Sequence, residues 1–532
     1  MNINKAFYPF LFAIILSSGI FLGFKLQERN ASRFKIYNED GAGTKLDYIL
    51  QLIDAKYVDT VNQKELYDKA INQLLSDLDP HSVYLPPVES KHEEEIMEGN
   101  FEGIGVEFMI TKDTIQVVTP ISGGPSEQVG ISAGDKIIKV NDTTVAGIHI
   151  DNEMVMKLLK GPKGSKVRVT ILKRSGKIIN YTIQRDRIPI YSVDAGFLLD
   201  KTTGYIKINR FAKTTYFEFA ERLDSLKELG MQKLILDLRG NGGGYLDQAV
   251  NIVDEFLDDK KLIVYTEGRT IPRMEQTADK VGNFEDGELV ILIDEGSASA
   301  SEIVTGAIQD WDRGTIIGRR SFGKGLVQEE YPFPDGSALR LTIAKYYTPS
   351  GRCIQRPYIN GADEYYDDVA RRFKDGEAFV QDSIHNNKKE IYKTKIKGRT
   401  VYGGGGITPD IFIPLDTSMF NPLVTDAFNN GIISEFAYNY YYAHKNDFAG
   451  YKDFESFKNN FSVSNSLYNE FISYCFKNGM DKTDEKYSAA SQQFLGLRIK
   501  AFIAKQLFKS DGFYGILATD DTMILKALQV LK

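Results

Sequence analysis

The chain has 532 residues, of which 42% are hydrophobic and 26% are charged, and its formal net charge is −7. This length exceeds what one hydrophobic core supports, so we expect several domains. The mild negative charge argues against nucleic acid as a main partner, because nucleic-acid-binding domains cluster positive charge. Neither of the two cysteines lies in a metal-ligand spacing, and we expect no metal and no cofactor.

The N-terminus carries a long uncharged segment. Residues 6–24 contain no charged side chain and lie between Lys5 and Lys25. Their length is close to the ~20 residues that span a bilayer and exceeds the apolar core of a usual signal peptide. The positive N-terminal flank is expected to stay in the cytoplasm, which places the rest of the chain outside it. We therefore predict an uncleaved anchor within residues 1–30; a cleaved signal peptide is the alternative.

Two helices are predicted within residues 31–98. Apolar residues recur at helical spacing over residues 46–57 and again over residues 66–78. A helical pair of this kind usually serves packing, and we assign it no catalytic role.

Residues 99–187 change to short β-rich runs separated by turn signals, with one helical stretch between them. This size and order resembles a PDZ domain. The resemblance implies that a peptide C-terminus adds as a strand to the sheet edge, and that backbone N–H groups of a glycine-containing loop hold its carboxylate. By the same resemblance, the loop residues are Gly103, Ile104, Gly105 and Val106. Ile104 and Val106 are then expected to line the side-chain pocket; the alternative is a structural turn before a strand.

A strand, a glycine-rich turn and a helix follow further along the chain. The apolar run 233–238 predicts a buried strand, residues 239–244 form the turn, and residues 246–257 have a helical pattern. Phosphate binding is the competing interpretation of such a turn. However, the turn lacks the lysine and the Ser/Thr of a P-loop and fits the dinucleotide-binding pattern poorly. We interpret Asp237 and Arg239 as residues that fix the turn through hydrogen bonds.

A candidate nucleophile follows a second buried strand. The apolar run 290–293 ends at a glycine turn, and a helical pattern resumes at Ile303. Ser299 is therefore expected at a helix N-terminus, where free N–H groups and the positive end of the helix dipole suit a developing oxyanion. The alternative is that Ser299 only caps the helix.

A candidate base lies 25 residues further on. Lys324 stands between two glycines and Gln328 follows, with no histidine in this part of the chain, so a Ser-Lys dyad is favoured over a Ser-His-Asp triad. A lysine acts as a base only when neutral, which requires burial to lower its pKa from about 10.4 toward about 7–8. Gln328 can orient the amine without restoring its positive charge. The alternative is that Lys324 is a solvated loop lysine.

Together these segments resemble the carboxyl-terminal processing (tail-specific) serine proteases. The resemblance rests on residues 297–302 and 322–328, and on further motifs in the expected order across roughly residues 40 to 415. It implies Ser299 as the nucleophile, Lys324 as the general base and Gln328 as the residue that orients the lysine.

The resemblance also implies an oxyanion hole. One N–H comes from Ala300, directly after the serine, and the other from Gly243 or Gly244 in the glycine-rich turn. The sequence does not decide between the two glycines.

The predicted fold is a multi-domain α+β protein. It comprises the N-terminal anchor, a small helical unit, a PDZ domain, an α/β Ser-Lys protease core of the ClpP/crotonase-like kind, and a helical C-terminal domain. The predicted boundaries are 1–30, 31–98, 99–187, 188–415 and 416–532. Residues 356–400 are an insertion in the core, interpreted as a surface elaboration, with a lid over the substrate as the alternative. Aromatic residues at helical spacing predict the C-terminal helices.

The predicted function is a serine endopeptidase that recognises the free C-terminus of a protein through its PDZ domain and cleaves near it, in processing or degradation of envelope proteins. The resemblance, with its mostly exported bacterial members, favours catalytic domains in the periplasm, held at the cell inner membrane by a single-pass anchor. The expected partners are proteins or peptides with accessible C-termini and the inner membrane, and an oligomer is left open. The alternative is a catalytically silent PDZ scaffold of the cell envelope.

Overall fold

The computed structural model describes residues 42–258, 260–359, 361–384, 390–480 and 488–532. The chain divides into two compact units, one up to Leu75 and one from Ser76 onward. The predicted anchor at residues 6–24 lies outside the described residues. Within the described residues, no helix is both long and apolar enough to cross a bilayer.

The described part of the first unit forms two helices, as the helical spacing predicts. They are α2 (Ala42–Lys56) and α3 (Gln63–Ser76). The second unit begins with β1 (Val83–Leu85) and α4 (Pro87–Glu98). Pro87 occupies the first turn of α4, where its missing N–H costs no hydrogen bond.

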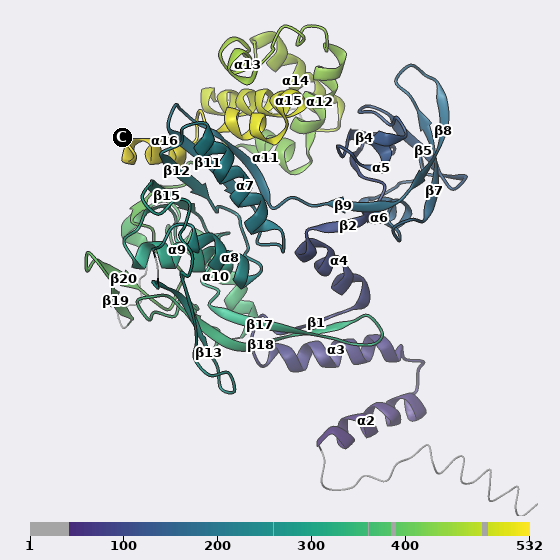
Figure 1. The fold of residues 1–532 in the computed structure, drawn as a ribbon. Helices are drawn as coiled ribbons and strands as arrows, with labels where there is room; N and C mark the ends of the chain where they lie inside the picture. The colour runs from purple at the N-terminus through teal and green to yellow at the C-terminus, as the bar shows by residue number, and fades with distance from the viewer. Residues whose placement is uncertain (1–41, 259, 360, 385–389, 481–487) are drawn as a thin grey trace, which may run out of the picture. The chain divides into compact units, whose positions relative to one another are not determined.

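The β-rich region predicted to be a PDZ domain forms a sheet with strand order β3-β4-β5-β7-β8, in which β6 pairs with β5 (Figure 1). The strand β3 therefore stands at one end of the sheet. A separate ribbon of β2 and β9 links the region to the rest of the chain. The elements are β2 (Asn100–Gly103), β3 (Val106–Ile110), β4 (Ile115–Pro120), α5 (Pro125–Gln128), β5 (Lys136–Val140), β6 (Thr143–Thr144), α6 (Asn152–Leu159), β7 (Lys166–Leu172), β8 (Ile178–Gln184) and β9 (Asp186–Pro189).

A six-stranded sheet forms the centre of the next region, in the order β10-β11-β12-β15-β16-β21. Only the β10–β11 pair is antiparallel, so the loops after β12 and β15 leave the sheet at the same edge. The elements are β10 (Val193–Leu198), β11 (Thr203–Ile208), α7 (Thr215–Glu228), β12 (Lys233–Asp237), α8 (Leu246–Asp254), β15 (Glu288–Ile293), α9 (Ala300–Asp310), β16 (Thr315–Gly318) and β21 (Ile411–Phe412).

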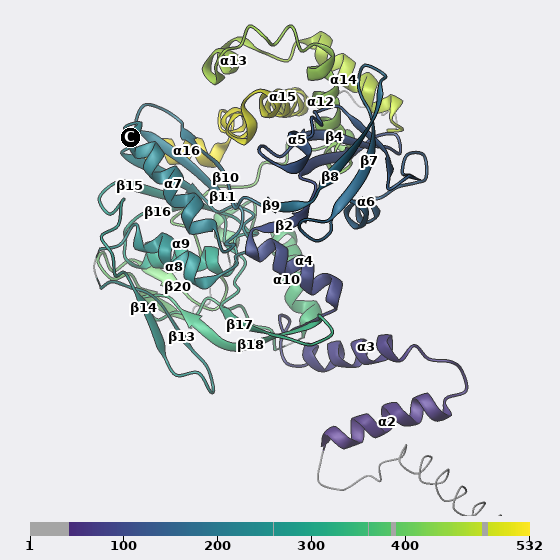
Figure 2. The ribbon, with the colours of Figure 1, turned by 45° about the vertical axis from the view of Figure 1, so that its right-hand side comes forward.

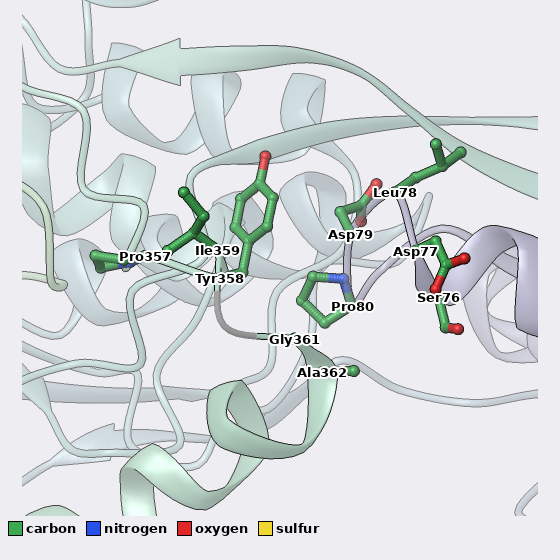
Figure 3. Close-up of a pocket in the computed structure, with 10 residues that line it drawn as sticks. All are labelled: Ser76, Asp77, Leu78, Asp79, Pro80, Pro357, Tyr358, Ile359, Gly361 and Ala362. Carbon is green, nitrogen blue, oxygen red and sulfur yellow. The ribbon is translucent and has the colours of Figure 1, made fainter.

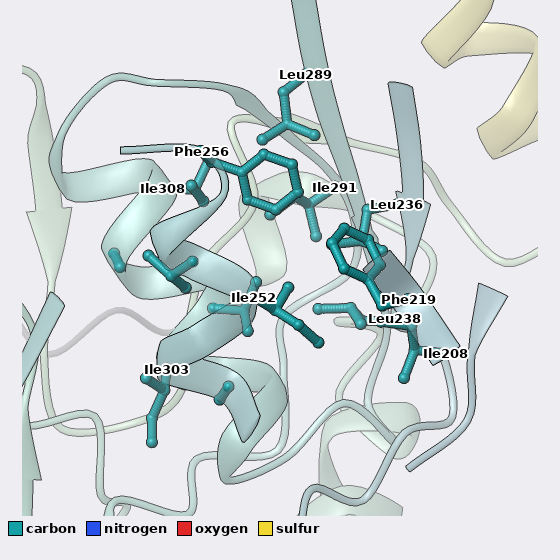
Figure 4. Close-up of a cluster of buried hydrophobic side chains, with 14 of the residues drawn as sticks. Ile208, Phe219, Leu236, Leu238, Ile252, Phe256, Leu289, Ile291, Ile303 and Ile308 are labelled. Atoms are coloured by element: carbon teal, nitrogen blue, oxygen red, sulfur yellow. The ribbon is translucent and has the colours of Figure 1, made fainter. Parts of the chain in front are cut away.

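The central sheet is buried on both faces, which explains the continuous apolar runs of β12 and β15. On one face, Leu236 and Ile291 pack with side chains of α7, α8 and α9, including Phe219, Ile252 and Ile303 (Figure 4). On the other face, the alternate strand residues pack against the C-terminal end of the chain. These contacts involve Ile235, Val290, Leu292, Met523, Ile524, Ala527 and Leu531.

A second sheet packs beside the first and carries the segment that follows Lys324. Its order is β1-β18-β13-β14, and β17 also pairs with β18. Its further strands are β13 (Leu262–Glu267), β14 (Met274–Thr277), β17 (Leu326–Pro332) and β18 (Ala338–Tyr347). The insertion predicted at 356–400 holds α10 (Ala362–Lys374), a 3₁₀ turn (Gln381–Ser383), β19 (Ile391–Lys393) and β20 (Thr400–Tyr402).

The C-terminal region is helical, as predicted, with an aromatic-rich core of its own (Figure 2). Its helices are α11 (Pro422–Asn429), α12 (Ile432–Ala443), α13 (Phe454–Asn460), α14 (Asn465–Lys477), α15 (Ala489–Leu517) and α16 (Thr522–Val530). One helix of this stretch packs outside that aromatic-rich core. Because α16 covers one face of the central sheet, it belongs to the core of the preceding region.

Candidate active site

The two strand–turn–helix units predicted from the sequence face each other at one edge of the central sheet. A Cβ atom added to Gly243 would lie 2.7 Å from Ser299 Cβ and 3.0 Å from the Ala300 nitrogen. The Ala298 N–H donates to the Asn241 carbonyl at 2.9 Å. Only glycine fits at position 243, which also has a φ of +102°. The glycine turn therefore lies directly against the candidate nucleophile.

Ser299 precedes the first residue of α9, as predicted. Its backbone has φ +55° and ψ −114°, an uncommon conformation for a residue with a side chain. Strain of this kind persists only where surrounding contacts enforce it, and it occurs preferentially at functional sites. The Ser299 side chain thus sits on a sharp strand-to-helix turn beside the N-terminus of α9.

Lys324 and Gln328 are also brought together, as predicted. Lys324 Nζ donates to Gln328 Oε1 at 2.8 Å, and Gln328 Nε2 donates to the His81 carbonyl at 2.5 Å. Burial lowers the pKa of Lys324 to about 8, and the positive charge of Arg340 acts in the same direction. Gln328 is therefore held in place at its amide nitrogen while its oxygen accepts from the lysine.

Glu302 was not among the predicted site residues, yet its carboxylate joins both halves of the site. Its Oε2 accepts from the backbone N–H of Ser299 and of Lys324, both at 2.9 Å. Its Oε1 accepts from Ser321 Oγ at 2.5 Å and from the Gly323 N–H at 2.8 Å. Burial raises the pKa of Glu302 to about 7, although these four donors favour the charged form. The Ser-x-x-Glu spacing of a capping box was the sequence signal that could have identified it.

Tyr346 makes the complementary contacts on the carbonyl side. Its hydroxyl oxygen lies 2.7 Å from the carbonyl oxygen of Lys324 and 3.0 Å from that of Ser299. The side chain comes from β18 and is buried. Ser299 and Lys324 are therefore tied together at their N–H groups by Glu302 and at their C=O groups by Tyr346. No sequence signal indicated this role.

The geometry distinguishes the two candidate oxyanion-hole glycines. The Gly243 N–H already donates to Asn241 Oδ1 at 2.9 Å. A short parallel bridge uses the Gly243 carbonyl and the Tyr245 N–H, both paired with Phe211. The Gly244 N–H donates to no group in the described part of the chain. Of the two glycines, Gly243 lies against Ser299, and Gly244 is the one whose N–H is not already used by a described residue.

The insertion contributes α10 to the surroundings of the candidate lysine, through contacts that the interpretation as a surface elaboration did not include. Arg372 Nη1 donates to the Ser321 carbonyl at 2.8 Å. The Tyr365 hydroxyl lies 2.8 Å from His81 Nε2. The guanidinium of Arg356 stacks between the rings of Tyr365 and Phe322, 3.9 Å from each centroid. Residues from the insertion thus fix both the loop before Lys324 and the segment that holds Gln328.

A pocket of about 730 Å³ lies between the segments 76–80 and 357–362 (Figure 3). Among the described residues that line it, none is a predicted site residue. Its wall is connected to the site through Pro80. The Pro80 carbonyl accepts from the Tyr366 hydroxyl at 2.5 Å, and the carbonyl of the next residue, His81, accepts from Gln328. The candidate chemistry is therefore placed at Ser299 and not in this pocket.

The predicted carboxylate-binding loop lies between β2 and β3. Gly105 has a φ of +71°, which suits the turn into the edge strand β3. The Ile104 side chain is buried in the core of this region and the Val106 side chain is half-buried, so their expected place in a side-chain pocket stays a prediction. The Ile104 carbonyl accepts from Ser126 Oγ at 2.6 Å.

Comparison with known proteins identifies both the β-rich region and the region that holds Ser299. The sequence model of peptidase family S41 matches residues 202–363, and that of the PDZ domain matches residues 103–184. A family of unknown function matches residues 423–509. The protein is accordingly a serine-type peptidase, a hydrolase with a PDZ domain.

Two relatives define the family. The carboxy-terminal-processing protease of Bartonella bacilliformis is 38% identical over 314 residues, covering 58% of this chain and 71% of the relative. The carboxy-terminal processing protease CtpA of Bacillus subtilis is 31% identical over 408 residues, covering 75% and 87%. The solved photosystem II D1 C-terminal processing protease is 25% identical, with a TM-score of 0.35 over 70% of this chain and 87% of that one. The chain belongs to the carboxy-terminal processing proteases.

Replacing Glu302 with glutamine tests the tie between the two halves of the site. A glutamine offers one acceptor oxygen and places an NH₂ group against N–H donors, so we expect a loss of about 2 kcal/mol or more in unfolding free energy. Misplacement of Ser299 and Lys324 is expected to lower kcat about 100-fold. Denaturant unfolding and peptide cleavage measure the two effects.

Glu255→Gln is the matched control. Glu255 is also buried and accepts from Tyr216 and Asn283, but it lies away from Ser299. This variant should lose stability and keep kcat. Equal loss of kcat in both variants would contradict a specific role of Glu302.

Proposed function

We propose that the protein is an endopeptidase that recognises the free C-terminus of a protein through its PDZ domain and cleaves near it with a Ser299–Lys324 dyad. Ser299 Oγ attacks the scissile carbonyl carbon while neutral Lys324 takes its proton. Gln328 orients the amine. The Ala300 N–H and a glycine N–H, Gly244 in preference to Gly243, bind the oxyanion.

The second half of the reaction uses the same groups. Lys324, now protonated, gives its proton to the leaving amine, and the C–N bond breaks. A water molecule then attacks the carbonyl carbon of the acyl-enzyme while neutral Lys324 accepts its proton, the ester bond to Ser299 Oγ breaks, and Lys324 returns the proton to Oγ. The lysine therefore has to gain and lose a proton twice per turnover, which a pKa near 8 permits.

The observation that carries this proposal is the single carboxylate oxygen of Glu302 shared by the Ser299 and Lys324 N–H groups. It supports a dyad because it fixes nucleophile and base relative to each other, with a neutral Gln328 and not a carboxylate at the amine. The loop Gly103–Val106 at the edge strand β3 supports capture of a peptide end by strand addition.

The cellular location is part of the same proposal. An uncleaved anchor over residues 6–24 would hold the chain at the inner membrane as a single-pass protein, with the catalytic domains in the periplasm and envelope proteins as substrates. The uncharged length of this segment and its flanking lysines support that placement.

Ser299→Ala and Lys324→Ala should each reduce cleavage of an unfolded protein with an apolar C-terminus to background, because each removes a reacting group. Lys345→Ala, which changes an exposed lysine of β18, should keep wild-type turnover. Gel-based cleavage with purified full-length protein measures this. Cleavage by either dyad variant at the wild-type rate would show that the assignment is wrong, and an inactive wild type would favour the scaffold alternative.

The pH profile tests the state of the lysine. Because the base form is neutral, kcat/KM should rise with pH through a midpoint near pH 8. Gln328→Glu places a carboxylate beside Nζ, stabilises the ammonium and should shift this midpoint to higher pH, with lower activity at pH 7. Gln328→Leu removes the hydrogen bond without adding charge, so it should lower activity without that upward shift. An unmoved midpoint in Gln328→Glu would argue against Lys324 as the titrating base.

Amidation of the substrate C-terminus tests recognition separately from chemistry. A neutral amide cannot make the charge-assisted contacts that a carboxylate makes with loop N–H groups, so KM should rise about tenfold or more for the amidated substrate. A substrate whose C-terminus is blocked as an ester should behave like the amidated substrate, because it also lacks the carboxylate. Equal cleavage of free and blocked substrates would remove the carboxylate from recognition.

A further inference from the structure

The turn that precedes the candidate oxyanion hole begins at a buried group of charges. Arg239 donates to Asp237 through Nε at 3.0 Å and through Nη2 at 2.6 Å. Tyr205 and Lys207 also bond to Asp237, at 2.7 and 3.3 Å. Burial opposes ionisation of Asp237, but Arg239 and Lys207 outweigh it and hold the pKa of this carboxyl well below its ordinary value.

The remaining guanidinium nitrogen of Arg239 binds a residue 282 positions further along the chain. Arg239 Nη1 donates to Asp521 Oδ2 at 2.7 Å. The other oxygen of Asp521 caps α16 by accepting from the N–H groups of Met523 at 3.0 Å and Ile524 at 3.1 Å. The same two residues pack against the central sheet. Asp521 is therefore fixed by the sheet and in turn fixes Arg239.

The charges in this group balance. Two carboxylates, Asp237 and Asp521, face two cations, Arg239 and Lys207, and the side chains of Arg239 and Asp521 are only 20% and 23% exposed. A partly buried guanidinium keeps one geometry when each of its edges has a carboxylate partner. Without Asp521, one edge of Arg239 loses its partner.

The turn after Arg239 depends on such external contacts. It contains four glycines, and Gly240, Gly243 and Gly244 all have positive φ. Glycine has little conformational preference of its own, so the path of the turn is set by what holds it. Lys207 bonds to the Arg239 carbonyl, and the Gly240 N–H donates to Asp294 at 2.8 Å. The start of the turn is thus placed by Arg239 and its neighbours.

We propose that Asp521 is a positioning residue for the oxyanion turn, so that the C-terminal end of the chain is part of the catalytic apparatus. Asp521 acts through Arg239 and touches neither substrate nor reacting atoms. The inference rests on the proposed function, since it takes the 240–244 turn as an oxyanion donor. It assigns a role to a segment that lies beyond the family match at 202–363.

Asp521→Asn separates this role from helix capping. Asparagine caps a helix about as well as aspartate, so α16 should stay in place. With its oxygen used for the cap, the asparagine presents an NH₂ group to Arg239, and the contact is lost. We expect kcat to fall about tenfold with KM unchanged, because an imperfectly placed oxyanion donor weakens the transition state and not substrate binding. Asp521→Ser, which also caps but does not reach Arg239, should give the same result.

Asp453→Asn is the matched control in the full-length protein. Asp453 caps α13 in the same way, accepting from Ser456 N at 2.7 Å, and it lies in the helical C-terminal region. Its kcat, KM and melting temperature should match wild type. A peptide aldehyde, whose adduct with Ser299 carries the oxyanion, should bind Asp521→Asn more weakly by the factor lost in kcat.

The outcomes separate the two proposals. If Ser299→Ala still cleaves, the proposed function fails. If Ser299→Ala is inactive but Asp521→Asn has wild-type kcat and aldehyde affinity, only the positioning role is overturned. A loss of kcat in Asp521→Asn accompanied by an equal fall in melting temperature and folded fraction, with aldehyde affinity per folded molecule unchanged, also overturns it.

Discussion

The site depends on one buried carboxylate that accepts four hydrogen bonds. Glu302 lies inside the protein, where a charge is expensive, and its raised pKa of about 7 reflects that cost. Its donors come from Ser299, directly before α9, and from the loop before β17, two segments that no continuous secondary structure connects. Because a carboxylate accepts in fixed directions, the spacing of Ser299 and Lys324 follows from it. The strained backbone of Ser299 is one conformation that this arrangement enforces.

Burial, which disfavours the charged form of Glu302, also disfavours the charged form of Lys324. A buried ammonium is disfavoured, so its pKa falls toward the physiological range, provided that no carboxylate bonds directly to Nζ. Gln328 meets that condition, and its own orientation is imposed by the His81 carbonyl. The His81 ring in turn contacts Tyr365 of α10. The insertion therefore contributes to the contacts that orient Gln328 and, through it, Lys324, and its helix α10 is buried at Tyr365 and Arg372.

Local patterns predicted the elements of the site but not the contacts that assemble them. Continuous apolar runs identified β12 and β15, and parallel neighbours necessarily end at one edge, so the meeting of the glycine turn with Ser299 could be anticipated. Residues distant in sequence carry no such signal. Tyr346, the His81 carbonyl and the α10 contacts depend on tertiary packing that spacing does not encode. The same holds for α16, which has the pattern of one more amphipathic helix until the sheet face that it covers is known.

The C-terminal region contacts both the PDZ domain and the region that holds Ser299. Before the kink at Phe508 and Lys509, α15 carries Lys505, which pairs with Glu107 on the edge strand β3 at 2.7 Å. After the kink, the Tyr514 hydroxyl donates to Asp194 of β10 at 2.9 Å. The chain then continues to Asp521, which accepts from Arg239, the residue before the glycine-rich turn. The C-terminal end of the chain therefore contacts both the strand expected to pair with a peptide and the turn expected to bind the oxyanion. Its packing contributes to the positions of both.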